Sequence, residues 1–66
     1  MQVHVNGEAM ERPDDETLAT LLAALGANQN RVAVMVNEDV ILVTERATRR
    51  LAAGDRVEIL TFAGGG

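Results

Sequence analysis

The residues of this sequence whose types and spacing could support chemistry lie at its C-terminal end. Three glycines, Gly64, Gly65 and Gly66, follow Ala63. Glycine has no Cβ and adopts any φ, so such a segment can follow a narrow path dictated by another protein. The α-carboxylate of Gly66, with an ordinary pKa of about 3.3–3.7, is ionised at neutral pH and can attack the α-phosphate of ATP. The resulting acyl-adenylate would accept a sulfur or nitrogen nucleophile.

Other groups are weaker candidates for chemistry. His4 is the only histidine, so no pair of histidines can bind a metal ion. The acidic run 14–16 is expected at the positive end of a helix rather than in a metal site. Arg49 and Arg50 could bind a phosphate, but we expect them in a solvated loop. No cysteine is present, which excludes disulfides, thiolate metal sites and cysteine nucleophiles.

Composition narrows the possible partners. The net charge is −4 and Phe62 is the only aromatic residue, which argues against a nucleic-acid partner. No apolar stretch approaches the roughly 18 residues of a membrane span, and we expect neither a span nor a signal peptide. The absence of disulfides fits a cytoplasmic protein. All six basic residues are arginines, so no lysine amine is available for a Schiff base or for polymeric isopeptide chains.

The first part of the chain predicts a β-hairpin. In residues 2–6 the side chains alternate, and Val3 and Val5 share one face of the strand. Asn6-Gly7 follows, a pair that favours a tight hairpin turn because both residues tolerate a positive φ. We therefore expect a return strand over residues 8–12.

A helix is predicted to follow this hairpin. Asp14, Asp15 and Thr17 are candidates for its N-cap, and Gly26 stands where a glycine commonly ends a helix. Between them, four leucines recur at i, i+3, i+4 and i+7 and so share one helix face: Leu18, Leu21, Leu22 and Leu25. We expect this face to pack on a sheet and to have no separate function.

The second half of the chain predicts three more strands. Residues 32–36 alternate, with valines on one face, and a turn over residues 37–39 leads to a short strand over residues 40–43. Residues 44–53 are polar and arginine-rich, and we expect them to be irregular or to form one short helical turn. The last strand is expected over residues 56–62.

This last strand is apolar on both faces. Its inward side chains are expected to be those of Val57 and Ile59. Because one helix covers only one face of a sheet, Leu60, Phe62 and Met35 should form an exposed apolar patch at the root of the glycine tail. Such patches mark partner surfaces. The alternative is partial cover of the patch by residues 44–53.

The order of these elements predicts an α+β fold of the β-grasp type, with a mixed sheet of four to five strands and one main helix. In that topology the first and last strands pair in parallel at the sheet centre, although periodicity alone does not fix the pairing. We expect one domain over residues 1–62 and a flexible glycine-rich tail over residues 63–66. Extended, such a tail reaches about 13 Å, far enough to enter a partner's active site.

The arrangement of these motifs resembles the ThiS family, the sulfur carriers of thiamine biosynthesis. The resemblance runs nearly the whole chain in the right order. The residues that carry it are Val5-Asn6-Gly7-Glu8, Leu25-Gly26, Arg31-Val32-Ala33-Val34, Val36-Asn37, Gly54-Asp55-Arg56-Val57-Glu58-Ile59, Thr61-Phe62 and the terminal Gly-Gly. A terminal Gly-Gly alone is less specific, because ubiquitin and the small subunit of molybdopterin synthase share it.

The resemblance implies a chemical role for the tail. A ThiF-type adenylating enzyme would adenylate Gly66 with ATP and Mg²⁺, and sulfur delivery would then leave a thiocarboxylate on Gly66. Thiazole synthase, ThiG, would take the sulfur into the thiazole ring. The chain would bind no cofactor, would supply no catalytic side chain, and would be a protein cosubstrate rather than an enzyme. We expect it to be a monomer when free.

Two departures from the family and three alternative functions remain at this point. Asn37-Glu38 replaces the family's Asn-Gly turn, and residues 44–49 are expected to form a shortened loop without the usual proline and aromatic residue.

The alternative functions are a sulfur carrier for molybdopterin or another metabolite, a ubiquitin-like modifier joined to protein lysines, and a structural domain with an idle tail.

Overall fold

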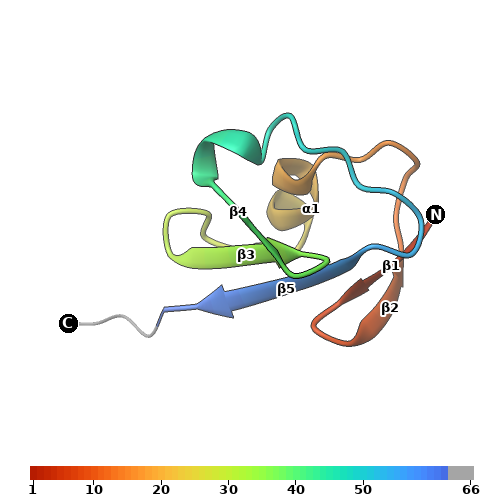
Figure 1. The fold of residues 1–66 in the computed structure, drawn as a ribbon, viewed down its shortest axis with the longest axis horizontal. Coiled ribbons are helices and arrows are strands. Elements are labelled where there is room, and N and C mark those ends of the chain that lie inside the picture. The colour runs from red at the N-terminus through yellow and green to blue at the C-terminus, as the bar shows by residue number, and fades with distance from the viewer. Residues whose placement is uncertain (63–66) are drawn as a thin grey trace.

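Five strands form one mixed sheet, and a single α-helix covers one of its faces in residues 1–62, which the computed structural model describes (Figure 1). The elements in chain order are β1 (Gln2–Val5), β2 (Glu8–Glu11), α1 (Leu18–Ala24), β3 (Val32–Val36), β4 (Asp39–Ile41), the 3₁₀ helix η1 (Val43–Glu45) and β5 (Arg56–Thr61). The strand order is β2-β1-β5-β3-β4. Only the β1–β5 pair is parallel among these strands, and β5 lies at the centre, which confirms the predicted β-grasp arrangement.

The first hairpin forms as predicted. Asn6 and Gly7 have φ values of 49° and 86°, the two positive values that a type I′ turn requires. The side chain of Asn6 also bridges to β5, because its Oδ1 accepts a hydrogen bond from Ile59 N at 2.8 Å and its Nδ2 donates to Ile59 O at 3.3 Å. Asn6 therefore shapes the turn and extends the contact between β1 and β5.

Helix α1 begins after Thr17, whose Oγ1 accepts a hydrogen bond from Thr20 N at 3.3 Å. It ends at Ala24, and its C-cap Leu25 is followed by Gly26 with a φ of 72°. Three of the four predicted stripe residues are buried, Leu18, Leu21 and Leu22. The fourth, Leu25, is 39% exposed because it lies at the C-cap, where the helix leaves the sheet.

The acidic run before α1 differs from the prediction. No acidic residue lies in the first turn of the helix, so these carboxylates do not form its N-terminal turn. Glu16 instead turns inward, where its side chain is only 2% exposed and accepts two hydrogen bonds of 2.7 Å from the Arg12 guanidinium. These bonds raise the pKa of Arg12 above its ordinary value. The pair ties the end of the hairpin to the start of the helix.

The β3–β4 hairpin is shorter than predicted. Strand β3 has the predicted bounds and buries alternate valines, but β4 covers Asp39–Ile41 rather than residues 40–43. The chain leaves the sheet after Ile41 because Glu45 Oε1 accepts a hydrogen bond from Leu42 N at 3.0 Å, which closes η1. The preceding turn keeps two positive φ values, 50° at Asn37 and 74° at Glu38.

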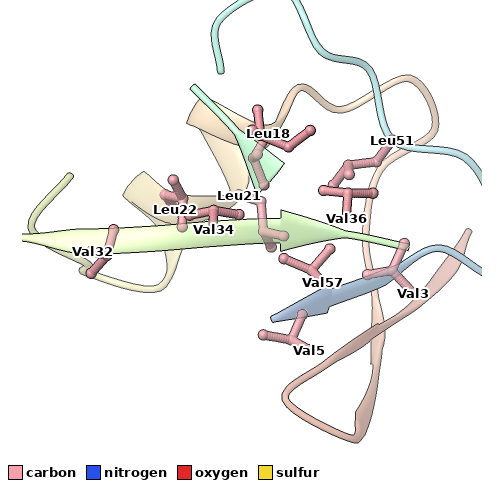
Figure 2. Close-up of a cluster of buried hydrophobic side chains, with 11 residues drawn as sticks. Val3, Val5, Leu18, Leu21, Leu22, Val32, Val34, Val36, Leu51 and Val57 are labelled. Carbon is pink, nitrogen blue, oxygen red and sulfur yellow. The ribbon is translucent and has the colours of Figure 1, made fainter. Parts of the chain in front are cut away.

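The segment between η1 and β5 is irregular, as predicted, but it contributes to the interior. It runs on the same side of the sheet as α1 (Figure 1). Leu51 is buried in the core, Arg50 forms an isolated bridge with Thr17, and Arg46 O accepts a hydrogen bond from Ala19 N at 3.0 Å. The core between sheet and helix consists of Val3, Val5, Leu18, Leu21, Leu22, Val32, Val34, Val36, Ile41, Leu51 and Val57 (Figure 2).

Candidate docking face and tail root

The sheet face opposite α1 carries exposed apolar side chains near the end of β5. Val57 points into the core, whereas Leu60 and Phe62 are 58% and 60% exposed. Leu60 lies directly opposite Ala33 in the β3–β5 register. Met35 shares this outer face, because Val34 and Val36 on either side of it are buried. The three predicted patch residues, Leu60, Phe62 and Met35, therefore lie on one face.

Strand β4 extends this apolar surface. Val40 lies opposite Met35 in the β3–β4 register, so both point to the same face, and Val40 is 68% exposed. We call the resulting surface the outer patch, which consists of Ala33, Met35, Val40, Leu60 and Phe62. Ala33 and Val40 could not be assigned to this surface from the sequence, because their membership follows from strand register and not from any local pattern.

Residues 44–53 do not cover the outer patch. Leu51 of this segment is buried in the core beside α1, and Arg50 pairs with Thr17 just before the helix. Both contacts place the segment on the opposite side of the sheet from Leu60. The alternative in which this segment covered the patch is therefore wrong.

The root of the tail is held at the end of β5 by two neighbouring residues, the first residue of β3 and the residue before it. Thr61 pairs with Val32, and Phe62 N donates a hydrogen bond of 2.9 Å to Arg31 O. Figure 1 shows β5 ending beside the loop that precedes β3, on the side of the molecule away from the N-terminus. The predicted tail residues Gly64, Gly65 and Gly66 lie outside the described residues.

No side-chain arrangement in residues 1–62 suggests catalysis or metal binding. His4 is half-buried on the outer face, and no group of three or more His, Cys, Asp or Glu side chains in the described range could hold a metal ion. Arg50 is exposed, and the half-buried Arg49 uses its carbonyl to accept a hydrogen bond from Leu18 N. No pocket opens into the described part of the chain. None of its helices is long and apolar enough to cross a membrane.

Comparison with known sequences gives one family and two kinds of relative. The ThiS family profile matches residues 3–66. The sulfur carrier protein ThiS of Thermus thermophilus is 38% identical over 65 residues, which cover 97% of this chain and 98% of that protein. Thiazole synthases of Paramagnetospirillum magneticum and Magnetococcus marinus are 33% and 35% identical over 66 residues. This chain spans 20% of the length of each of these two enzymes.

Solved structures of one protein share the fold. The crystal structure of the thiamine biosynthesis protein ThiS from Geobacter metallireducens superposes with a TM-score of 0.86 at 32% identity, and the match covers all of both chains. The solution structure of a thiamine biosynthesis protein from the same organism gives a TM-score of 0.81 and covers 88% of that chain.

Proposed function

The chain belongs to the ThiS family, and we propose that it carries sulfur for thiamine biosynthesis on the carboxylate of Gly66. A carboxylate oxygen of Gly66 attacks the α-phosphate of ATP and releases pyrophosphate. Sulfide-level sulfur (HS⁻) from the donor then attacks the acyl carbon, so that a C–S bond forms, the C–O bond to AMP breaks and AMP leaves. Loss of the thioacid proton gives the thiocarboxylate. The observation that carries the proposal is the family match, which reaches residue 66. The chain is a protein cosubstrate in this scheme, and its partners supply the catalytic groups.

Two partners follow from this role. A ThiF-type adenylating enzyme binds ATP and Mg²⁺ and activates Gly66, and thiazole synthase, ThiG, accepts the sulfur. The thiazole synthase relatives support the second partner, because each contains a segment similar to this whole chain within a protein five times as long. Joining two proteins in one polypeptide raises their effective concentration toward each other, which favours pairs that act together.

The outer patch is the proposed docking surface for these partners. It lies directly beside the tail root, so a protein that covers Leu60 and Phe62 also receives the residues that follow Phe62. Exposed apolar side chains at the centre of an interface supply most of its binding energy when they are fully desolvated. A small domain with no pocket in its described residues can therefore deliver a reactive group without enclosing the reaction itself.

Intact-mass measurement tests the carrier function. The protein is produced together with a ThiF-type enzyme, a sulfur donor and ATP. The expected product has one oxygen of the Gly66 carboxylate replaced by sulfur, and fragmentation should locate the change at Gly66. A variant lacking Gly66 is the control and should remain unmodified while keeping its fold. A native chain that keeps an ordinary carboxylate under these conditions would contradict the proposal.

Transfer to the acceptor separates the thiamine pathway from the alternatives. The thiocarboxylate form is incubated with thiazole synthase and its small substrates, and in parallel with a molybdopterin synthase large subunit. We expect loss of sulfur and formation of the thiazole only in the first reaction. Sulfur loss only in the second would assign the carrier to molybdopterin. Attachment of the chain to protein lysines would instead identify a ubiquitin-like modifier.

A further inference from the structure

Arg46 is the one arginine of residues 1–62 whose side chain is buried, with 2% of it exposed. It follows η1, and its guanidinium reaches across to the loop before β3 and to the first residue of that strand. Nη1 donates a hydrogen bond of 2.7 Å to Gln29 O, and Nη2 donates one of 2.7 Å to Val32 O. Nε has no hydrogen-bond partner, and no carboxylate of the described residues forms an ion pair with this side chain.

The loop that Arg46 holds is the same loop that holds the root of the tail. Its carbonyl partners, Gln29 and Val32, lie on either side of Arg31. Arg31 O accepts the hydrogen bond from Phe62 N at 2.9 Å, the last described contact before the tail. One guanidinium therefore fixes both flanks of the residue to which the end of β5 is tied.

The burial of the Arg46 guanidinium indicates that its role is to hold its two carbonyl acceptors in a fixed arrangement, and not only to fill space. A buried charge without a counter-ion is unfavourable, and two carbonyls offset only part of this cost. An apolar side chain of similar length, such as methionine, would fill the same space without that cost. What the guanidinium adds is a planar fork that holds two acceptors at a fixed spacing through charge-assisted hydrogen bonds.

We propose that Arg46 is a positioning residue for the transfer reaction: by fixing the carbonyls on either side of Arg31, it holds in place the last described contact of β5, the hydrogen bond from Phe62 N to Arg31 O. This inference rests on the proposed function, because it assumes that the residues after Phe62 enter a partner's active site. Removal of the guanidinium should leave the outer patch in place. It should loosen the Phe62 end of β5, and small misplacements of a reacting group reduce rates strongly.

Hydrogen exchange tests the structural part of the proposal without any partner. The variants are Arg46→Met and Arg46→Lys. Val3→Ala is the control, a destabilising change on β1, which lies on the other side of β5 from β3. In Arg46→Met the Phe62 amide should exchange about tenfold faster than in the control. The variant lacks the two guanidinium hydrogen bonds, so they no longer oppose local opening at this site. The Asn37 amide, which donates to Arg56 O at the other end of β5, should change no more than in the control.

Kinetics with the adenylating enzyme test the functional part. Arg46→Met should lower kcat for adenylation by about tenfold or more while KM for the carrier changes by less than about twofold, because docking is kept and alignment is lost. Arg46→Lys, which can reach one carbonyl but not both with fixed geometry, should fall between Arg46→Met and the native chain. Val3→Ala should match the native chain once the folded fraction is taken into account.

Either of two results would overturn the proposal: Phe62 exchange equal to that of the control, or a kcat equal to the native value in Arg46→Met. If Arg46→Met does not fold, Arg46→Lys supplies the same comparison. If the native chain is not adenylated at all, the proposed function is wrong. The exchange result then decides alone whether Arg46 holds the end of β5.

Discussion

Glu38 holds a backbone conformation that a residue with a side chain does not favour. Its φ is 74°, and it follows Asn37, whose φ is 50°. Asn37 is fixed from outside the turn, because its Oδ1 accepts a hydrogen bond from Arg56 N at 3.0 Å and its Nδ2 donates to Asp55 Oδ1 at 2.9 Å. The turn therefore forms through Asn37 and the two flanking strands, in spite of Glu38.

Replacing Glu38 by glycine should stabilise the protein. Relief of the left-handed conformation is worth roughly 1–2 kcal/mol, and the extra chain entropy of a glycine removes about 0.5–1 kcal/mol of it. A net gain of about 0.5–1 kcal/mol should appear as a higher urea midpoint with an unchanged m value. Glu38→Ala is the matched control and should show no such gain. A lower midpoint for Glu38→Gly would contradict the assigned strain.

Single buried polar residues were the least predictable part of the molecule. Glu16 was predicted at a helix N-terminus and Arg46 in a polar, irregular segment, yet both are buried. Both are charged, and a charge is buried only where particular partners face it. For Arg46 those partners are two carbonyls near β3, which tertiary folding alone brings close. For Glu16 the partner is the Arg12 guanidinium, only four residues earlier, but this spacing does not show that the pair is buried.

Helix α1 is too short to be stable by itself and depends on its buried leucines. It has seven residues, whereas isolated helices shorter than about 12–15 residues are marginal in water. Its inward face supplies three of the fully buried large side chains, Leu18, Leu21 and Leu22. Leu25, at the end of the same stripe, is 39% exposed. The helix is therefore held by packing against the sheet, and its residues contribute unequally.

Leu22→Ala should destabilise the protein far more than Leu25→Ala. Truncating a buried leucine costs about 2–5 kcal/mol, a large part of the total stability of a small domain. The partly exposed Leu25 should lose less than about 1 kcal/mol on truncation, because it leaves a smaller cavity. Urea unfolding followed by circular dichroism measures both changes. Equal losses in the two variants would show that the stripe is not divided in this way.

The elements with local signals were predicted well, and the contacts between distant elements were not. Asn6-Gly7, the leucine stripe and the valines of β3 each show their structure within a few residues, and the structure confirms all three. The parallel pairing of β1 with β5 joins residues more than fifty positions apart, such as His4 and Arg56. It was expected only because the element order fits a known topology. The early end of β4 depends on one side chain, Glu45, that caps the next turn.

At the scale of the whole molecule, the sheet separates two surfaces of different kinds. One face is buried under α1 and the segment that contains Leu51, and the other carries the outer patch. The positions of Leu60 and Phe62 on this exposed face could be predicted from alternation along one strand. The contributions of Ala33 and Val40 could not, because register between strands decides them.

Phe62→Asp should weaken binding to the two proposed partners, the adenylating enzyme and thiazole synthase, by about tenfold or more, since burial of a charge opposite an apolar partner surface is unfavourable. Leu42→Asp is the matched control, because Leu42 is 61% exposed, against 60% for Phe62, and lies outside the outer patch. Titration calorimetry or surface plasmon resonance measures both affinities. Equal affinities for the two variants would remove the outer patch from the interface.

The central place of β5 has a consequence for how the protein is made. Strands β1 and β3 are synthesised earlier, but neither has its inner neighbour until β5 is inserted between them. A nascent or truncated chain that stops before Arg56 leaves both strands with unpaired edges and the core incomplete, a condition that proteases and chaperones recognise. The folded state therefore exists only in chains whose translation has passed through β5, and partially made molecules lack Leu60 and Phe62 of the outer patch.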